Sequence, residues 1–411
     1  MNNIRSSFTY LEKDFFGNHR IFFENSGGSL RLEEVCKTSN EIHKIPDCPR
    51  RSHDASKFIG EIIDKGKEDI KNFFNFKNGT ILTHLTASSL MFEIMQKIAS
   101  TAEGKNIVTT PIEHPAAFDA CKLASKKYNL TLRVSKANKK TGGVDTESLY
   151  EKVDENTSIV SIIAASNITG AKNDIINIVK KIREINPEVY IVVDAVQAAA
   201  HSLIDVEAWD VDVVCIAPYK MFGNRGVAFA FVSERLIEIP HNRLLDSEND
   251  NWELGSPVPA HYAEFSEIVK YICLIGSNFI ESNKKRDLIE EGMKRIHSHE
   301  QAMLSIFIKG TKNVEGLKSI KNLKLHFAEE NQENHELILP ISFTNIDTIK
   351  AMEMYKDNNI IVFNREYDSY YSHRILNALD LNSIIRVSPL HCHNINEIEG
   401  FLQVTKKIAQ T

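Results

Sequence analysis

Apolar and polar residues alternate in blocks through the middle of the chain. Between about residues 80 and 235, short apolar runs are separated by segments in which apolar residues recur at helical spacing. The runs expected to form strands are 107–110, 131–134, 159–163, 189–193, 211–216 and 227–232. The stretch 173–184 is typical of the intervening helices. Near-continuous apolar strands alternating with amphipathic helices predict a mostly parallel, doubly wound α/β sheet.

The pattern changes after Pro257. A long helical stretch over residues 264–306 is followed by β-like, helical and β-like segments, and then by an amphipathic tail. These later segments are 336–343, 347–357, 359–363 and the chain from residue 395. With 411 residues, the chain is long enough for two domains. We expect a large domain at 20–258 and a smaller α+β domain formed by 1–19 and 259–411.

Composition excludes several classes of protein. Hydrophobic residues make up 42% and charged residues 25%, which is ordinary for a soluble globular protein. The net charge of −6 comes without a basic block, so we expect no nucleic-acid partner. The sequence has no apolar run of membrane-spanning length and no signal-peptide core at its start, so we expect no membrane partner. The six cysteines form no CxxC pair, which predicts neither a disulfide framework nor a metal site and favours the cytoplasm.

Two ionisable residues follow neighbouring apolar runs. Asp194 ends the run at 191–193, and Lys220 follows the run at 213–216, with Gly223 and Gly226 close behind. Ligands of open α/β sheets bind beyond the carboxyl ends of the strands. A lysine at that edge, opposite an aspartate, suits a Schiff base with pyridoxal phosphate, in which the acid pairs with the pyridine nitrogen. Taken singly, the lysine could be a surface residue and the aspartate a helix cap.

Other polar residues could meet the same ligand. Gln197 lies one helical turn after the aspartate and could offer its amide to a phenolate oxygen. His114 follows another predicted strand, where it is either a ring stacked on an aromatic cofactor or a loop histidine. Residues 83–89 precede a helix, and the start of that helix could hold a phosphate, although the glycines of a Walker loop are missing. We interpret His201 as a histidine on a helix face.

Five further segments carry a resemblance to a known family. They are IFFENSGG at 21–28, RSH at 51–53, ASNITG at 165–170, WELGSP at 252–257 and IRVSPLHC at 385–392. Together with the segment around the lysine, and in this order, they resemble the class V aminotransferase family of fold-type I pyridoxal-phosphate enzymes. The similarity is greatest to the branch of cysteine desulfurases, selenocysteine lyases and isopenicillin-N epimerases, and it covers nearly the whole chain.

The resemblance implies a fold, a cofactor and roles for single residues. The fold would be a mostly parallel, seven-stranded sheet flanked by helices, with a smaller α+β C-terminal domain, in a homodimer. Lys220 would bind pyridoxal 5′-phosphate and move the substrate's α-proton, with Asp194 and His114 as the other catalytic residues. The cofactor-binding residues would be Lys220, Asp194, Gln197, His114, Thr86, Ala87, Tyr219 and Ser256, the last reaching the partner's cofactor. Substrate would be bound by Arg386, which would clamp its carboxylate, and by Asn25 and Asn167.

The chain also departs from the family pattern. The Ser-x-His that precedes the family's lysine is Ala217-Pro218-Tyr219, whose phenol can take the place of the imidazole. The phosphate loop has Leu85 where glycine is usual and Ser88 where glutamate is common. The loop at 362–373, where desulfurases carry a nucleophilic cysteine, has none. Cys392 falls after Arg386, and we expect it to be a packed core residue.

These observations predict an enzyme acting on an amino acid or cysteine derivative through a Schiff base and an α-carbanion. The interpretation we favour is a desulfurase-like C–S lyase that works by β-elimination. Transamination and epimerisation stay open. An inactive scaffold in a sulfur-handling complex is the alternative from another class, because the phosphate contacts are altered. Polar and aromatic residues in the loop at 362–373 favour a substrate larger than free cysteine; they are Arg365, Tyr367, Tyr370, Tyr371 and His373.

Overall fold

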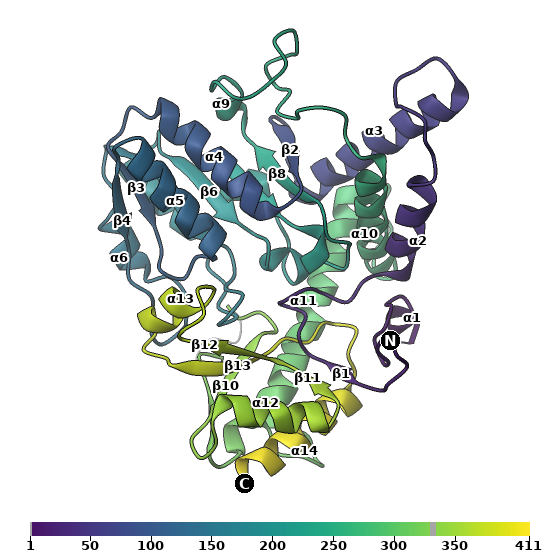
Figure 1. Cartoon of the computed structure of the whole chain (residues 1–411), viewed down its shortest axis with the longest axis vertical. Helices are drawn as coiled ribbons and strands as arrows, with labels where there is room; N and C mark the ends of the chain where they lie inside the picture. Colours follow the sequence, from purple (N-terminus) through teal and green to yellow (C-terminus); the bar gives the residue numbers. More distant parts are fainter. Residues whose placement is uncertain (1, 329–333) are drawn as a thin grey trace.

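The computed structural model describes residues 2–328 and 334–411. Within these residues a seven-stranded large sheet and a four-stranded small sheet lie one above the other (Figure 1). The large sheet has the strand order β2–β8–β7–β6–β5–β3–β4. Its strands are β2 Thr80–His84, β3 Asn106–Thr109, β4 Thr131–Val134, β5 Thr157–Ile163, β6 Tyr190–Asp194, β7 Val213–Ile216 and β8 Ala228–Val232. Within this sheet six strands share one direction and β8 runs opposite to them, which confirms the predicted mostly parallel sheet.

Helices cover both faces of the large sheet. Val192 and Val213 share a hydrophobic cluster with α4 (Ala87–Thr101) and α5 (Pro115–Lys127). The next residues along the two strands, Val193 and Val214, belong to the cluster that contains α7 (Ile175–Ile185) and α10 (Pro259–Ser277). Successive strand residues point to opposite faces. Burial on both faces therefore explains why these strands are continuous apolar runs in the sequence.

The single long helix predicted over residues 264–306 is wrong. The chain instead forms two helices, α10 and α11 (Lys285–Lys309), which pack against each other as an antiparallel pair. Their backbones approach closely at two glycines. A Cβ atom on Gly276 would lie 2.1 Å from the carbonyl oxygen of Leu288, and one on Gly292 would lie 2.2 Å from that of Ile272. The two helices pack against each other, so the chain must reverse direction between them. Helical periodicity in the sequence does not reveal such a reversal.

The small sheet is antiparallel, with the order β12–β13–β10–β9. Its strands are β9 Leu323–Leu325, β10 Leu339–Phe343, β12 Phe363–Glu366 and β13 Ser383–Val387. A separate short pair joins the N-terminal segment to this part of the molecule: β1 (Ile21–Phe22) runs parallel to β11 (Ile360–Ile361). The small sheet, the C-terminal end of α11 and helices α12 (Thr348–Asp357) and α14 (Ile395–Ala409) enclose a core of their own.

The division into two domains remains a proposal, and packing indicates where its borders lie. Helix α10 packs on α2 and α3 beside the large sheet. Phe23 belongs to the core of the small sheet, and α11 contributes Met293 to the large core and Phe307 to the small one. We therefore propose borders near residue 24 and within α11, instead of those at 20 and 258.

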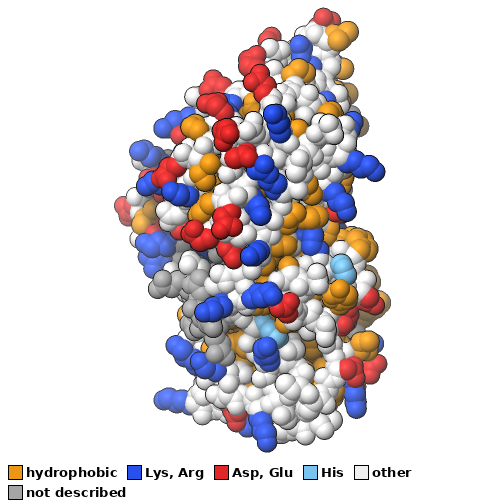
Figure 2. All heavy atoms as spheres, turned by 90° about the vertical axis from the view of Figure 1, so that its left-hand side faces the viewer, with side chains coloured by type: hydrophobic (Ala, Val, Ile, Leu, Met, Phe, Trp, Pro, Cys, Tyr) orange, Lys and Arg blue, Asp and Glu red, His pale blue; other side chains and the backbone are white. Residues whose placement is uncertain are grey.

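The other helices complete the two layers. They are α1 Asn2–Arg5, α2 Glu33–Ile42, α3 Asp54–Phe74, α6 Thr146–Tyr150, α8 Val206–Trp209, α9 Glu234–Ile237 and α13 His373–Ala378. In the described part of the chain, every helix is too short or too polar to span a membrane. Figure 2 shows basic and acidic side chains interspersed over one face of the molecule, without a block of one sign.

Candidate active site

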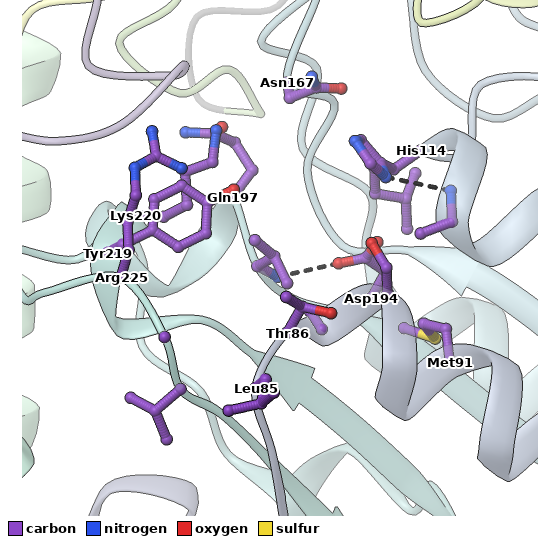
Figure 3. A pocket seen from close by; sticks show the side chains of 17 residues that line it. Leu85, Thr86, Met91, His114, Asn167, Asp194, Gln197, Tyr219, Lys220 and Arg225 are labelled. Atoms are coloured by element: carbon purple, nitrogen blue, oxygen red, sulfur yellow. Dashed lines mark hydrogen bonds between the residues drawn. The ribbon is translucent and has the colours of Figure 1, made fainter. Parts of the chain in front are cut away.

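A cavity of about 420 Å³ lies at the carboxyl ends of the central strands of the large sheet (Figure 3). Its lining includes eight of the residues predicted for the site. They are Thr86, Ala87, His114, Asn167, Asp194, Gln197, Tyr219 and Lys220. They come from five separate segments of the chain, each at or after the end of a strand of the large sheet. The open α/β sheet thus brings them together at the edge where its ligands bind.

Lys220 is a buried amine without a carboxylate partner among the described residues. It ends a short 3₁₀ turn (Pro218–Lys220) directly after β7, and its Nζ donates a short hydrogen bond to the carbonyl of Ser26. Burial, reinforced by the charge of Arg386, lowers the pKa of Lys220 to about 7. A large fraction of this amine is therefore unprotonated at neutral pH, as the attack on an aldehyde requires.

Asp194 is a buried carboxylate at the end of β6. Its Oδ1 accepts a hydrogen bond from the backbone N–H of Val196 (3.0 Å). Burial raises the pKa of Asp194 to about 6, because neither this hydrogen bond nor the charge of Lys220 offsets the lost hydration. A cationic N–H group in the cavity would supply the missing partner, and a protonated pyridine nitrogen has that chemistry.

His114 presents an uncharged ring to the cavity. It is the N-cap of α5, and its Nδ1 accepts a hydrogen bond from the backbone N–H of Ala116 (3.2 Å). Burial, followed by the charge of Lys220, lowers the pKa of His114 to about 4. The imidazole is therefore neutral at pH 7, with its proton on Nε2. A flat neutral ring at this place suits stacking on an aromatic cofactor.

The start of α4 offers hydrogen-bond donors for an anion. The hydroxyl of Thr86 caps this helix by accepting from the N–H of Ser89 (3.1 Å). The N–H groups of Ala87 and Ser88 belong to the first turn, where helices lack internal acceptors, and both residues line the cavity. Arg225, which sequence reasoning missed, also lines the cavity, with its guanidinium carbon 4.3 Å from the ring centroid of Tyr219. These donors and this cation suit a phosphate group.

Gln197 connects the cavity to a buried polar network. Its Nε2 lies 3.3 Å from Nε2 of His201, and Nδ1 of His201 lies 2.8 Å from a carboxylate oxygen of Glu300. The other oxygen of Glu300 accepts from the backbone N–H of His391 (3.0 Å). The helix-face interpretation of His201 is wrong, because the side chain is fully buried between the large sheet and α11. Sequence reasoning had no signal for this pair, because Glu300 is about a hundred residues away.

We expect Glu300→Gln to destabilise the protein by about 3–5 kcal/mol at pH 7, because it leaves His201 without its buried partner. Burial opposes ionisation of Glu300, but His201 outweighs it and lowers the pKa of this carboxyl to about 2. Its usual value is 4.5, so the stabilisation is complete above pH 4.5 and is lost as the pH falls towards 2. Urea unfolding at pH 7 and pH 3 measures both effects.

Glu290→Gln, at a partly exposed ion pair on the same helix, is the control and should cost less than about 1 kcal/mol. An equal loss from Glu300→Gln at both pH values would refute this account.

The three residues predicted to bind substrate differ in their surroundings. Asn167 lines the cavity, and its buried Oδ1 has no hydrogen-bond partner in the described chain. Arg386 lies behind it, donating to the carbonyl of Asn167 (2.8 Å) and to the carboxylate of Glu24 (2.8 Å). Asn25 is outside the cavity lining, and its amide bonds the backbone of Phe22, Leu30 and Ser388. We therefore propose a structural role for Asn25 in place of the predicted substrate contact.

Ser256 lies outside the cavity that contains Lys220. It is an exposed residue beside a neighbouring cavity, which shares Leu85 and Gly226 with the first one. Its contact with a cofactor in the partner subunit remains a prediction.

Cys392 is fully buried, and burial raises the pKa of its thiol well above the usual 9.0, which confirms that it is a packed residue.

The fold and the site together define a pyridoxal-phosphate-dependent enzyme built on a mostly parallel α/β sheet. Residues 21–401 match the family described as Aminotransferase class-V. The chain therefore belongs to the class V aminotransferase family, whose members depend on pyridoxal phosphate.

Individual relatives cover the chain almost completely. A probable cysteine desulfurase from Borreliella burgdorferi is 24% identical, over 98% of this chain and 95% of its own length. A cysteine desulfurase from Wigglesworthia glossinidia brevipalpis is 21% identical, over 99% and 97%. Among solved structures, the apo cysteine desulfurase from Thermococcus onnurineus NA1 has a TM-score of 0.83 at 18% identity, with 100% of this chain and 98% of that chain covered. The cysteine desulfurase CsdA from Escherichia coli has a TM-score of 0.80 at 14% identity, with the same coverage. These structures share the fold.

Proposed function

We propose that this chain is a desulfurase-like C–S lyase that acts on cysteine or an S-substituted cysteine by β-elimination. The observation that carries the proposal is the cavity that gathers Lys220, Asp194 and His114 beside the first turn of α4. Its donors and charges fit the cofactor group by group. The first turn of α4 and Arg225 suit the phosphate, Asp194 suits the ring nitrogen, and His114 suits the ring face.

Pyridoxal phosphate, when bound, supplies an aldehyde that joins an amine and a ring that withdraws electrons from the substrate's α-carbon. The residues of the chain would do the rest. Lys220 would hold the cofactor and, as a free amine, would take the proton from the α-carbon. Asp194 would keep the ring nitrogen protonated by pairing with it. His114 would fix the ring plane, Gln197 would contact the ring oxygen, and Asn167, whose Oδ1 has no partner among the described residues, would contact the substrate.

The surroundings of the cavity favour elimination over the transfer of sulfur to an enzyme cysteine. No cysteine is among the described residues that line the cavity, and the loop at 362–373 contains none. Cys392 is sealed in the core as a neutral thiol. In an elimination, the C–S bond breaks with its electron pair leaving on sulfur. One water is consumed, and the products are the thiol, pyruvate and ammonia.

We propose that the working form is a cytoplasmic homodimer. Ser256 is exposed on a loop at the edge of the cavity region, where a second subunit could bring its own cofactor within reach. This arrangement would add a hydroxyl to the phosphate contacts of each site. It would make up in part for the Ser-x-His that is replaced by Ala217-Pro218-Tyr219.

Product analysis tests the proposed reaction. The holoenzyme is incubated with L-cysteine and, separately, with S-methyl-L-cysteine, and pyruvate, alanine and the released sulfide or thiol are quantified. We expect pyruvate and thiol in equal amounts, without a 2-oxo acid being required. Alanine as the main product from cysteine would indicate sulfur transfer instead. A dependence on an added 2-oxo acid would indicate an aminotransferase, and loss of optical purity in recovered substrate would indicate an epimerase. A protein that takes up no cofactor would favour the scaffold.

A further inference from the structure

His201 lies behind Gln197, which lines the active-site cavity (Figure 3). The two residues flank a short 3₁₀ turn, Ala198–Ala200, whose three alanines are buried. This turn brings the side chains together, so that their Nε2 atoms are 3.3 Å apart. His201 itself is outside the cavity lining. The contact that it makes toward the cavity is therefore the amide of Gln197.

Two carboxylates surround the buried imidazole of His201. Its Nδ1 lies 2.8 Å from an oxygen of Glu300, and an oxygen of Glu336 lies within 4.8 Å of the ring nitrogen. Both carboxylates are buried as well. The other titratable groups that face them are two histidines: His297 is 3.8 Å from Glu336, and His391 is 3.7 Å from Glu300.

These surroundings hold a positive charge on His201. A neutral imidazole would leave two carboxylates buried together without a cation between them, which is costly. Burial disfavours the cation, but Glu300 and then Glu336 outweigh it and raise the pKa of His201 above its usual 6.5. A histidine cation carries a proton on each ring nitrogen. Glu300 accepts from Nδ1, so the N–H at Nε2 requires a second acceptor.

The amide of Gln197 can supply that acceptor. Its Oε1 is buried and has no hydrogen-bond partner among the described residues. The two ends of an amide have nearly the same shape, so the hydrogen-bond partners decide which end faces where. With Oε1 turned to the Nε2 proton of His201, both groups are satisfied. The NH2 group of Gln197 then faces the cavity, where it is free to donate.

The orientation of this amide matters for a bound pyridoxal ring. The ring oxygen that Gln197 would contact carries negative charge, so it accepts a hydrogen bond from an NH2 group and is repelled by a carbonyl oxygen. A neutral His201 would favour the opposite orientation, because its Nε2 would accept from the NH2 group. The charge of His201 thus decides whether Gln197 offers the ring a donor or an acceptor.

We propose that His201 and Glu300 are a positioning pair that fixes the NH2 group of Gln197 toward the ring oxygen of the cofactor. This inference rests on the proposed function, because it concerns how that site controls its cofactor. The ring oxygen shares a proton with the nitrogen of the Schiff base. A donor held on this oxygen weakens its attraction for the shared proton, so the Schiff base would lose that proton at a lower pH.

The pH dependence of the visible absorbance of the holoenzyme tests the inference, because the band changes when the Schiff base loses its proton. His201→Leu combined with Glu300→Gln removes both charges at once and keeps an acceptor for the N–H of His391. We expect this pair variant to raise the midpoint of the transition by about one pH unit, as the loss of one hydrogen bond to a charged group implies. Gln197→Leu alone should raise it by a similar amount.

A combined variant shows whether the pair acts through Gln197. Added to Gln197→Leu, the pair variant should cause little further shift, because no amide is left to orient. Shifts that add in full would overturn the inference. His326→Asn is the control, because His326 is a buried histidine that bonds Ser342 in the small sheet and is outside the cavity lining. It should leave the midpoint unchanged.

Glu300→Asp is a milder variant that tests the inference even if the pair variant does not fold. It keeps the charge but shortens the reach of the carboxylate, and it should raise the midpoint by a smaller amount. An intact cofactor band with an unchanged midpoint in Glu300→Asp would overturn the positioning pair and leave the proposed function standing. A wild-type protein without a cofactor band would refute the proposed function and this inference with it.

Discussion

Lys220→Ala is expected to yield a folded protein that forms no covalent bond with pyridoxal phosphate and has lost catalysis by roughly 10⁴-fold or more. The substitution removes both the amine that holds the cofactor and the base that moves the α-proton. Folding should be unharmed, because Lys220 is a buried amine without an ion-pair partner among the described residues, and burial lowers its pKa to about 7. The visible absorbance of the purified protein and its turnover of S-methyl-L-cysteine measure the two losses.

Lys270→Ala is the matched control for this substitution. Lys270 is an exposed lysine on α10 that pairs with Glu267 one turn away. Its removal should leave the cofactor band and the turnover within about two-fold of wild type, because exposed ion pairs of this kind contribute little. A Lys220→Ala protein that retained a borohydride-reducible band and substantial turnover would show that another amine carries the cofactor.

Asp194→Asn is expected to lower turnover by roughly 10²–10³-fold, the usual effect of removing one preorganised electrostatic contact in a dry site. The asparagine amide is neutral and cannot hold the proton on the ring nitrogen, so the ring withdraws electrons from the α-carbon less strongly. Turnover of S-methyl-L-cysteine and the cofactor dissociation constant from equilibrium dialysis measure the effect. Asp194→Glu keeps the charge on a longer side chain and should retain more activity than the asparagine variant.

Measuring the stability of the cofactor-free Asp194→Asn protein tests whether unfolding causes that loss. Burial raises the pKa of Asp194 from 3.8 to about 6, so its ionisation destabilises the cofactor-free fold. That penalty grows as the pH rises from 3.8 to 6 and is complete above pH 6. Cofactor-free Asp194→Asn should therefore be more stable than wild type at pH 7, by about 1–3 kcal/mol. A variant that is less stable at pH 7, or one with wild-type turnover, would contradict the role given to Asp194.

The central sheet was predictable because its strands are buried on both faces. Every residue of β7 is buried, and this strand appears in the sequence as the unbroken apolar run Val213–Ile216. The break between α10 and α11 was not predictable from periodicity. It depends on the contact of Gly276 with the backbone of Leu288, which exists only after the two helices have packed.

The residues of the candidate site also fall into those that the sequence could group and those that it could not. Asp194 ends β6, while Lys220 and His114 lie four and five residues after the ends of β7 and β3, so local sequence and the rule for open sheets were enough to group them. Arg386 and Glu24 are brought together by β13 and by the N-terminal segment, which are more than three hundred residues apart. The commitment of Arg386 to Glu24 is a property of that packing. No pattern within either segment reports it.

The central claim is that Lys220 carries the cofactor opposite Asp194. Borohydride reduction of the holoenzyme fixes the carbon–nitrogen bond, and peptide mapping by mass spectrometry then identifies the labelled lysine. We predict a single reduced cofactor per chain, on the peptide that contains Lys220. Label on a different lysine, or no label in a protein saturated with pyridoxal phosphate, would contradict the account.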